Sequence, residues 1–522
     1  MDQPTHLSRI ARAASLVMVL FIASRALGLL REIVIARQFG TTAEMDAYLA
    51  AFRLPDFLFY VVAGGALGSA FIPVFTGYLT RQDMPGAWQL ASAVINWVLL
   101  ILSALGGLAA IFAPWLAQTF FADFTPAQQA LTAELMRWML ISTVIFGVSG
   151  VLMGILNAHQ HFFLPALAPI IYNVMIILAA WFLGPTWGVR GLTMGVVVGA
   201  AGHLLVQIPG LVQQRMHYGP ALAWRDSSLR EVGRLMAPRV LGLAAVQINF
   251  VVNAVLAARL TPGSLTALNY GWIMMLLPQG IVAQSVATAL FPTLATLAAT
   301  GERAEMRHVF GVTLRNLLFL TLPASVGLII WGEPIIRLVF QRGAFDATST
   351  QAVAWALGFF AVGLVGHSVV EIVTRAFYAL KNTKTPVLVA VAAMGVNIGL
   401  SIALMSLFEQ LGWPPHGGLA LANSIAVILE MTALLMLLRP QMDGRLAESN
   451  VWRPVGKMVV AAVGMTLALL GLQPVLPANP AWLVTGLGLL VGGLVYVGLA
   501  YLLKVDEFSA IHRQVIARLS WR

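Results

Sequence analysis

Cysteine is absent from this chain of 522 residues, and only 10% of its residues are charged. Without cysteine the chain can form no disulfide, no thiolate metal site and no thiol nucleophile. It also lacks the motifs of serine hydrolases, zinc peptidases, phosphate-binding loops and ATPase domains. Soluble domains usually contain about 25% charged residues, so the composition leaves no room for a sizeable soluble domain. We therefore expect no enzyme, no catalytic residues, no metal site and no cofactor.

Long apolar segments are abundant instead, since 59% of the residues are hydrophobic and such runs recur from Ala13 to Leu503. The pattern predicts an all-α polytopic membrane protein with about 14 transmembrane helices, each able to cross roughly 30 Å of hydrocarbon. An even number of spans places both termini on one side of the membrane. The predicted spans are residues 13–36, 45–75, 88–117, 131–156, 163–183, 189–213, 231–260, 266–298, 308–333, 350–379, 385–408, 417–438, 453–473 and 481–503.

The net charge of +10 does not indicate a nucleic-acid partner, because the basic residues are spread through short connections between the spans. One set of connections holds most of the arginines and lysines, including those in residues 215–234 and 439–457. Cytoplasmic connections are enriched in these residues, so we expect both termini to lie in the cytoplasm. The opposite connections hold only Arg37, Arg190, Arg259, Arg337 and Arg342.

An internal repeat divides the chain. At residues 157–161 a predicted helix ends in a polar turn before Pro165, and residues 381–386 repeat this pattern. Equivalent elements stand six helices apart, so the two halves share one orientation, as in transporters built from parallel repeats. The last two helices are either a lateral groove for a lipid tail or scaffolding. We predict an N-terminal six-helix lobe, a C-terminal six-helix lobe and two additional helices with a short tail, at residues 1–220, 221–440 and 441–522.

Charged residues inside the first two spans are the main candidates for a site. The first span contains Arg25 and Arg31, and the second contains Asp46, Arg53 and Asp56. A charge at the centre of a bilayer costs about 2.5–3.5 kcal/mol on insertion scales, so such residues usually mark a functional site. We expect the arginines to meet an anionic ligand in a wet cavity. The alternative is that Arg25 pairs with Asp46 and locks two helices together.

The spacing of these residues suits a phosphate ligand. Ser24 and Arg31 share one face of a helix, and Glu32 follows Arg25 by seven residues, which brings it near the same face. Guanidinium groups bind phosphate oxygens in pairs, so arginine is the usual residue for a buried diphosphate. Pro55 should bend the second span and free carbonyl groups to line a cavity. Arg31 and Glu32 could instead form an ion pair near the end of their helix.

Five further residues are candidates for cavity or gating positions. Gly64 and Gly65 offer either a flexible joint or close helix packing. Glu371 and Arg375 stand at an i,i+4 spacing, so they either serve in a site or neutralise each other. Asn249 could line the cavity of the second half, although a lone polar residue in a span more often bonds a neighbouring helix.

Several motifs together resemble one transporter family. They include Ser24-Arg25-x-Leu27-Gly28-x-x-Arg31-Glu32, Asp46-Ala47-Tyr48 and Phe52-Arg53-Leu54-Pro55, and the later segments 341–346 and 375–386. With these motifs the chain is similar to the MurJ (MviN) family of lipid II flippases, within the multidrug/oligosaccharidyl-lipid/polysaccharide exporter superfamily. The similarity runs over essentially the whole chain.

The resemblance implies a multi-pass protein of the bacterial cytoplasmic (inner) membrane with 14 helices, a V-shaped pair of lobes and a cationic central cavity. It implies that the protein moves undecaprenyl-diphosphate-linked peptidoglycan precursor, lipid II, from the inner to the outer leaflet by alternating access. Arg25 and Arg31 would then bind the diphosphate, Asp46 and Arg53 would shape the cavity, and Ser24 would line it. Peptidoglycan synthesis enzymes are the partners that such a role in cell wall biogenesis and cell shape implies.

Residues 271–278 depart from the family pattern, because relatives place charged residues there and this chain has none. Two alternatives therefore stay open. One is a flippase for another polyprenyl-diphosphate-linked glycan, and the other is a non-transporting scaffold of cell-wall synthesis. Without an ATPase domain, transport would be coupled to a monovalent cation gradient, the membrane potential or the gradient of the substrate.

Overall fold

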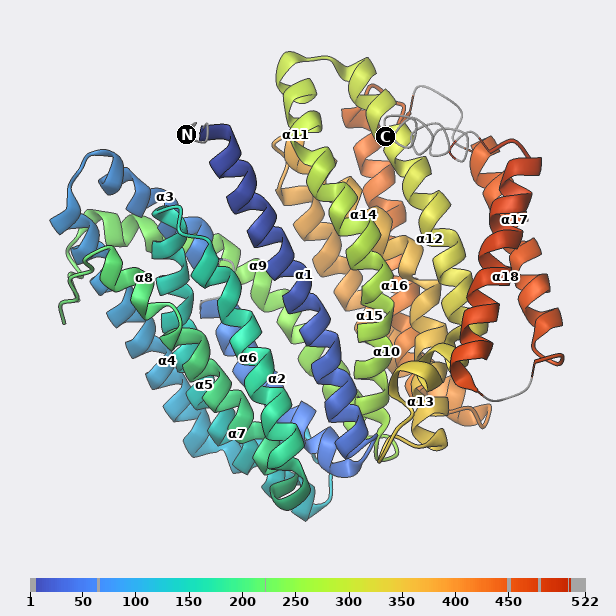
Figure 1. Cartoon of the computed structure of the whole chain (residues 1–522), viewed down its shortest axis with the longest axis horizontal. Coiled ribbons are helices and arrows are strands. Elements are labelled where there is room, and N and C mark those ends of the chain that lie inside the picture. The colour runs from blue at the N-terminus through green and yellow to red at the C-terminus, as the bar shows by residue number, and fades with distance from the viewer. Residues whose placement is uncertain are drawn as a thin grey trace, which may run out of the picture. The chain divides into compact units, whose positions relative to one another are not determined.

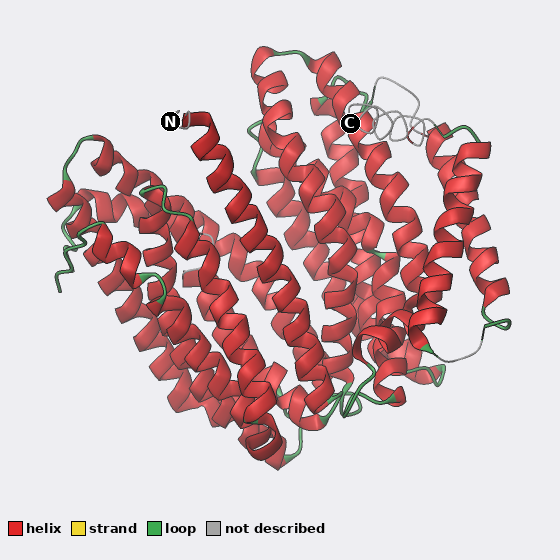
Figure 2. Ribbon diagram, viewed as in Figure 1, coloured by secondary structure: helices red, strands yellow, loops and turns green. Residues whose placement is uncertain are grey.

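The computed structural model describes residues 6–62, 66–220, 222–447, 452–476, 480–505 and 507. Within this part of the chain the fold is all-helical and contains no strand, as Figure 2 shows. The described residues divide into two compact units by their contacts. Unit 1 comprises residues 1–263 and 342–345, and unit 2 comprises residues 264–341 and 346–522.

Unit 1 holds the first nine helices, labelled in Figure 1. Pro85 and Pro126 stand in the first turns of α4 and α5, where the missing N–H of proline breaks no helical hydrogen bond. Their N-caps are Asp83 and Thr125, whose side chains accept hydrogen bonds from Gly86 N and Gln128 N. The helices are α1 (His6–Phe39), α2 (Ala43–Val62), α3 (Ala66–Thr80), α4 (Met84–Phe120), α5 (Pro126–Ala158), α6 (Phe163–Phe182), α7 (Gly184–Leu205), α8 (Ile208–Gln213) and α9 (Ser227–Ala258).

Unit 2 holds the remaining helices and a π-helical turn, η1 (Gln279–Gln284), between α10 and α11. The last two helices pack on α12, where Trp331 Nε1 donates a hydrogen bond to the Val484 carbonyl at 3.3 Å. The helices are α10 (Ser264–Pro278), α11 (Ser285–Thr300), α12 (Arg303–Phe340), α13 (Ala347–Val362), α14 (Leu364–Ala379), α15 (Lys384–Gln410), α16 (His416–Gln441), α17 (Trp452–Leu472) and α18 (Ala481–Leu502).

Ten segments of the described chain are long and apolar enough to cross a membrane, and the pair α13 and α14, bent by 44°, adds an eleventh. The three other predicted spans are α1, α2 with α3, and α9. Each of them carries charged residues inside or at the start of its helix. The ten apolar segments, the bent pair and these three segments together correspond to the 14 predicted spans. The all-α polytopic membrane fold with about 14 transmembrane helices is therefore confirmed.

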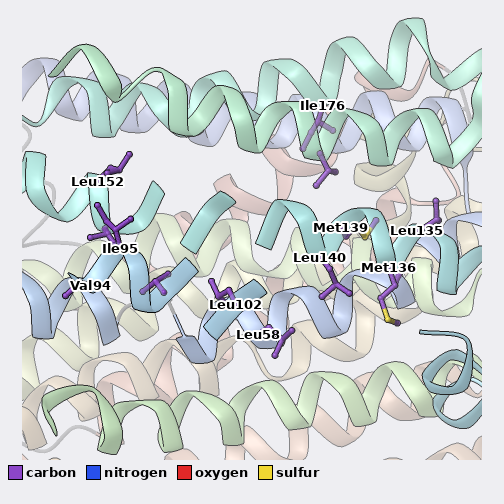
Figure 3. Packing of buried hydrophobic residues seen from close by; sticks show 14 of the residues in the cluster. Leu58, Val94, Ile95, Leu102, Leu135, Met136, Met139, Leu140, Leu152 and Ile176 are labelled. Carbon is purple, nitrogen blue, oxygen red and sulfur yellow. The ribbon is translucent and has the colours of Figure 1, made fainter. Parts of the chain in front are cut away.

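A buried apolar cluster fills unit 1 between α2, α4, α5 and α6, and Figure 3 shows part of it around Leu102, Leu140 and Ile176. Gly147 on α5 allows close approach to α4, because a Cβ at this position would collide with Leu102. This packing holds α5 against α2. The charged residues of α2 therefore lie beside a rigid core.

Helix α9 packs on α2 and α3, so unit 1 extends to Gly263 rather than to residue 220. The two compact units are defined by contacts between residues. The predicted lobes 1–220, 221–440 and 441–522 are defined by a repeat in the sequence, so the two divisions need not coincide. The division into six-helix lobes with two additional helices stays a prediction.

Candidate functional site

Arg31 on α1 joins two helices of unit 1. Its Nη1 donates to Asn173 Oδ1 on α6 at 3.1 Å, and its Nε donates to Glu32 Oε1 at 3.1 Å. Asn173 is held in place because its Nδ2 donates to the Pro169 carbonyl at 3.0 Å. Glu32 is buried, with 8% of its surface exposed, whereas 27% of the Arg31 side chain is accessible. The ion pair of Arg31 and Glu32 is therefore present, and the guanidinium still presents a face outside it.

Arg25 lies about two turns earlier on α1 and is exposed. Its guanidinium carbon lies 5.6 Å from the centre of the Phe21 ring, a cation–π distance. Ser24 beside it is half-buried. Glu32, which we expected near Arg25, forms an ion pair with its neighbour Arg31.

Asp46 at the start of α2 is buried, with 2% of its surface exposed. Its Oδ2 accepts a hydrogen bond from the backbone N–H of Gly263 at 2.6 Å. At least one carboxylate oxygen is thus directed to a backbone donor that follows α9. The pairing of Asp46 with Arg25, the alternative that the sequence left open, stays a prediction.

Gly263 was missed by the sequence analysis, although Pro262-Gly263 has the composition of a turn. Its φ is +91°, and a Cβ there would collide with the Thr41 carbonyl. Gly343, at φ +60°, meets the Arg37 carbonyl in the same way, and the Ala344 N–H donates to that carbonyl at 2.8 Å. Only glycine fits both the backbone conformation and the close approach. Two loops from distant parts of the chain are thereby fastened to the turn between α1 and α2.

Arg53 and Asp56 lie one turn apart on α2 and are both half-buried. The Nε of Arg53 is buried and has no hydrogen-bond partner among the described residues. The Asp56 carboxylate lies within electrostatic range of both Arg53 and Arg31, so α1 and α2 contribute to one charged region. Helix α2 continues through Pro55, whose carbonyl accepts from Thr143 Oγ1 at 3.3 Å.

A cavity of about 280 Å³ opens beside Asp56 within unit 1. Helices α2, α5, α6 and α7 line it, and the sequence analysis did not single out the polar residues that α5 to α7 supply. His203 is the most distinctive of them, since its Nδ1 is bonded to Ser149 Oγ at 2.7 Å. A histidine in an apolar span was the signal that could have drawn attention to it. The polar or aromatic lining residues include Asp56, Tyr60, Ser142, Thr143, Tyr172 and His203.

The remaining predicted residues lie apart from this region or outside the described chain. Glu371 and Arg375 on α14 form an i,i+4 ion pair with 3.7 Å between Oε2 and Nη2, so they neutralise each other. Asn249 lies on α9, and its carbonyl accepts from Asn253 Nδ2 at 3.0 Å. Because α9 packs with unit 1, Asn249 belongs to that unit by contacts. Gly64 and Gly65 lie outside the described residues.

Chemically, the region around α1 and α2 offers guanidinium donors next to buried carboxylates. Arg31 shares its charge with Glu32, while Arg53 has a buried N–H directed to no described acceptor. Such donors suit a ligand with several anionic oxygens. No group of three or more histidine, aspartate or glutamate side chains in the described chain could hold a metal ion.

Comparison with known proteins gives a consistent family. The profile of the lipid II flippase MurJ family matches residues 35–487. The lipid II flippase MurJ of Burkholderia cenocepacia is 30% identical over 470 residues, which cover 88% of each chain. The probable lipid II flippase MurJ of Bdellovibrio bacteriovorus is 31% identical over 512 residues, which cover 94% of each chain.

Solved structures agree with this result. A lipid II flippase MurJ in an inward closed conformation matches with a TM-score of 0.78 and 27% identity, covering 96% of this chain and 99% of its own. A multidrug resistance MATE family transporter of the MOP superfamily, in an inward-facing conformation, matches with a TM-score of 0.67. Its identity is only 15%, over 82% of this chain and 98% of its own, so it supports the fold alone.

Proposed function

Because the chain belongs to the lipid II flippase MurJ family, we propose that it carries lipid II, the undecaprenyl-diphosphate-linked peptidoglycan precursor, from the inner to the outer leaflet of the cytoplasmic membrane. The family consists of transporters, so the protein is not an enzyme. Alternating access is the proposed mechanism. It is supported by the similarity to a lipid II flippase MurJ in an inward closed conformation.

The observation that carries the proposal is the charged region formed by α1 and α2. Asp56 lies within electrostatic range of Arg31 and Arg53, so the charges of two helices act on one place. A diphosphate carries several anionic oxygens, which arginine binds through paired N–H donors. We propose that Arg25 and Arg31 bind the diphosphate, that Arg53 and Asp46 shape the site, and that Ser24 lines it.

The carboxylates have a separate role in this proposal. Glu32 and Asp56 lower the net positive charge of the region, so that a diphosphate is bound without being held too tightly to leave. Asp46 fastens the start of α2 to Gly263 and thereby fixes the direction in which α2 presents Arg53. Pro55 and Asp56 also line the cavity of about 280 Å³ between α2 and α5, so this cavity adjoins the charged region.

The uncharged α10 favours a second candidate, a flippase for another polyprenyl-diphosphate-linked glycan. The diphosphate is common to both substrates, so the arginines of α1 and α2 would serve either. The glycan would be distinguished by other residues, and the uncharged segment 271–278 of α10 is a candidate for this role. A scaffold of cell-wall synthesis enzymes is the third outcome that the experiment below distinguishes.

Membrane energetics determine how such transport could be driven. Moving one elementary charge across 100 mV is worth about 2.3 kcal/mol, so translocation of an anionic lipid responds to the membrane potential. A monovalent cation gradient is the other proposed source. The arginine-rich connections favour cytoplasmic termini, an orientation that belongs to the proposal.

The test measures lipid II in the outer leaflet of cells depleted of their own flippase. We expect the wild-type protein to restore exposure of lipid II, and Arg25→Ala to abolish it at normal protein abundance, because an exposed side chain contributes little to folding. Arg37→Ala is the matched control. Arg37 is also exposed on α1 and also stacks on an aromatic ring, Trp181, at 5.1 Å, and its loss should leave transport intact.

Other outcomes separate the alternatives. No restoration by abundant wild-type protein would reject lipid II and favour another glycan or a scaffold role. If Arg25→Ala only lowers abundance while the surviving protein transports normally, Arg25 is structural and the proposed diphosphate site is wrong.

A further inference from the structure

A segment of unit 1 that the proposed transport does not use lies against the first turns of α4. Residues 214–220 and 222, here called the strap, follow α8 and contact α4. Gly219 N–H donates to Ser92 Oγ at 3.1 Å, and Asn96 Nδ2 donates to the Gly219 carbonyl at 3.0 Å. Trp97 Nε1 donates to the Leu222 carbonyl at 2.9 Å. Three side chains of α4 thus hold the strap in place.

The strap and α4 enclose a cavity of about 680 Å³, within the range of sites for small ligands. Met84, Trp88 and Gln89 of α4 form one wall, and Arg215, His217 and Tyr218 of the strap form the other. The Tyr218 hydroxyl donates to Asn96 Oδ1 at 2.6 Å, which fixes its ring at the wall. Hydrogen bonds of Ser92 and Tyr218 thus hold the two walls of the cavity together.

Arg215 gives the cavity its charge. It is exposed, and its guanidinium has no hydrogen-bond or ion-pair partner among the described residues. The backbone of Arg215 has a φ of +52°, which is uncommon for a residue with a Cβ. The chain leaves the helical conformation here, just after the end of α8. None of the described residues that line the cavity is acidic. The cavity thus favours an anionic group.

An apolar stripe leads along α7 and α8 to Arg215. Leu205, Ile208 and Val212 are 58%, 38% and 69% exposed, and their spacing places them on one side of the helical segment. Arg215 follows the end of α8, three residues after Val212. In a membrane protein such exposed apolar residues face acyl chains. A stripe that ends in arginine with tryptophan and tyrosine nearby is typical of the interface between hydrocarbon and head groups.

We propose that this cavity binds the phosphate head group of an anionic glycerophospholipid, with an acyl chain along the stripe of Leu205, Ile208 and Val212. Arg215 binds the phosphate, and the glycerol or sugar-like hydroxyls lie against Gln89 and His217. Basic pockets at the ends of transmembrane helices recognise anionic lipids in this way. The inference concerns a lipid of the surrounding bilayer, so it does not depend on what the protein translocates.

The experiment is native mass spectrometry of the full-length protein titrated with phosphatidylglycerol or with phosphatidylcholine of the same acyl chains. We expect tighter binding of phosphatidylglycerol. Arg215→Gln should weaken it about fivefold, the usual contribution of one basic residue near an anionic lipid, and leave phosphatidylcholine binding unchanged. Gln89→Trp, which fills the cavity from an exposed position, should weaken phosphatidylglycerol binding as well.

Arg225→Gln is the matched control, because Arg225 stacks on Trp224 at 4.8 Å and does not line the cavity. Equal binding of both lipids, or equal effects of the Arg215 and Arg225 variants, would overturn the proposal. So would displacement of phosphatidylglycerol by inorganic phosphate, which would indicate a site for a free anion. If undecaprenyl diphosphate binds more tightly than phosphatidylglycerol and loses affinity in Arg215→Gln, the cavity serves the isoprenoid substrate instead. Each of these readouts is independent of flipping, so failure here leaves the proposed transport untouched.

Discussion

Helices α2 and α10 occupy equivalent places in the predicted repeat, yet they differ in charge. Helix α2 in unit 1 carries Asp46, Arg53 and Asp56 in its apolar sequence, whereas α10 in unit 2 carries no Asp, Glu, Lys or Arg. The polar groups near α10 satisfy one another, as His367 does with Asn423 Oδ1 at 3.0 Å. Trp272 on α10 packs edge-on against His367.

This difference is the reason why we place the proposed anion site in unit 1. In unit 2 the charged pair on α14 is internally neutralised, and the half-buried His367 has an amide partner. In unit 1 the buried Nε of Arg53 meets no described acceptor, and Arg31 remains accessible beside its partner. Four experiments test this contrast by comparing variants of unit 1 with variants of unit 2 or with a repaired double variant.

The largest effect should come from Arg31→Met. It leaves Glu32 as a buried charge without its guanidinium partner, and breaking a buried pair costs about 3–5 kcal/mol. We expect a large loss of thermal stability in a purified sample. The double variant Arg31→Met with Glu32→Gln should recover most of the stability, yet not the flipping. Full transport by the double variant would show that Arg31 is needed only for folding.

A backbone position should give the next effect. Gly263→Ala adds a Cβ that collides with the Thr41 carbonyl at a left-handed φ, so it should cost more than the ~1–2 kcal/mol of the conformation alone. Gly301→Ala in unit 2 is the control, since Gly301 has φ +78° but no atom within 4 Å of an added Cβ. Thermal unfolding of both variants measures the difference. Equal costs would mean that the junction at Thr41 can relax.

The N-caps of the two units should differ in their dependence on pH. Backbone N–H donors, chiefly that of Ser349, hold the pKa of Asp346 at the start of α13 below its usual value. A depressed pKa stabilises the fold at pH above the unfolded pKa of about 3.9, and the contribution is lost as pH falls through the folded pKa.

Asp346→Ala and Thr125→Ala should therefore each cost about 1 kcal/mol at neutral pH. Only the cost of Asp346→Ala should decrease as the pH falls below about 3.9, because the hydroxyl cap of α5 does not titrate in that range. Unfolding measured from pH 7 to pH 3 compares them. If the cost of Thr125→Ala decreases with pH as much as the cost of Asp346→Ala, the cause is a general loss of stability in acid and not the Asp346 carboxylate.

The smallest effect should come from the Glu371 and Arg375 pair. Both side chains are partly accessible and 3.7 Å apart, and i,i+4 pairs contribute about 0.3–0.5 kcal/mol. Exchanging both for glutamine should leave lipid II exposure near the wild-type level. A transport defect as large as that of Arg25→Ala would end the contrast between the two units.

Part of the site was predictable from the sequence. Arg25, Arg31, Asp46 and Arg53 stood out because ionised groups are rare in apolar spans. Their partners were not predictable, because Asn173 lies 142 residues from Arg31 and Gly263 lies 217 residues from Asp46. His203 and Tyr172 gained significance only where α5, α6 and α7 close a cavity around Asp56.

By itself the sequence determined the helical membrane fold, because the length and apolarity of each span are local properties that the bilayer reads segment by segment. It also determined which spans carry charge. The tertiary structure decided how each charge is used: Glu32 neutralises part of Arg31, Gly263 binds Asp46, and Arg53 keeps a donor. Hydrogen bonds depend on atoms placed within about 3 Å by the packing of distant helices, and no local pattern encodes that distance.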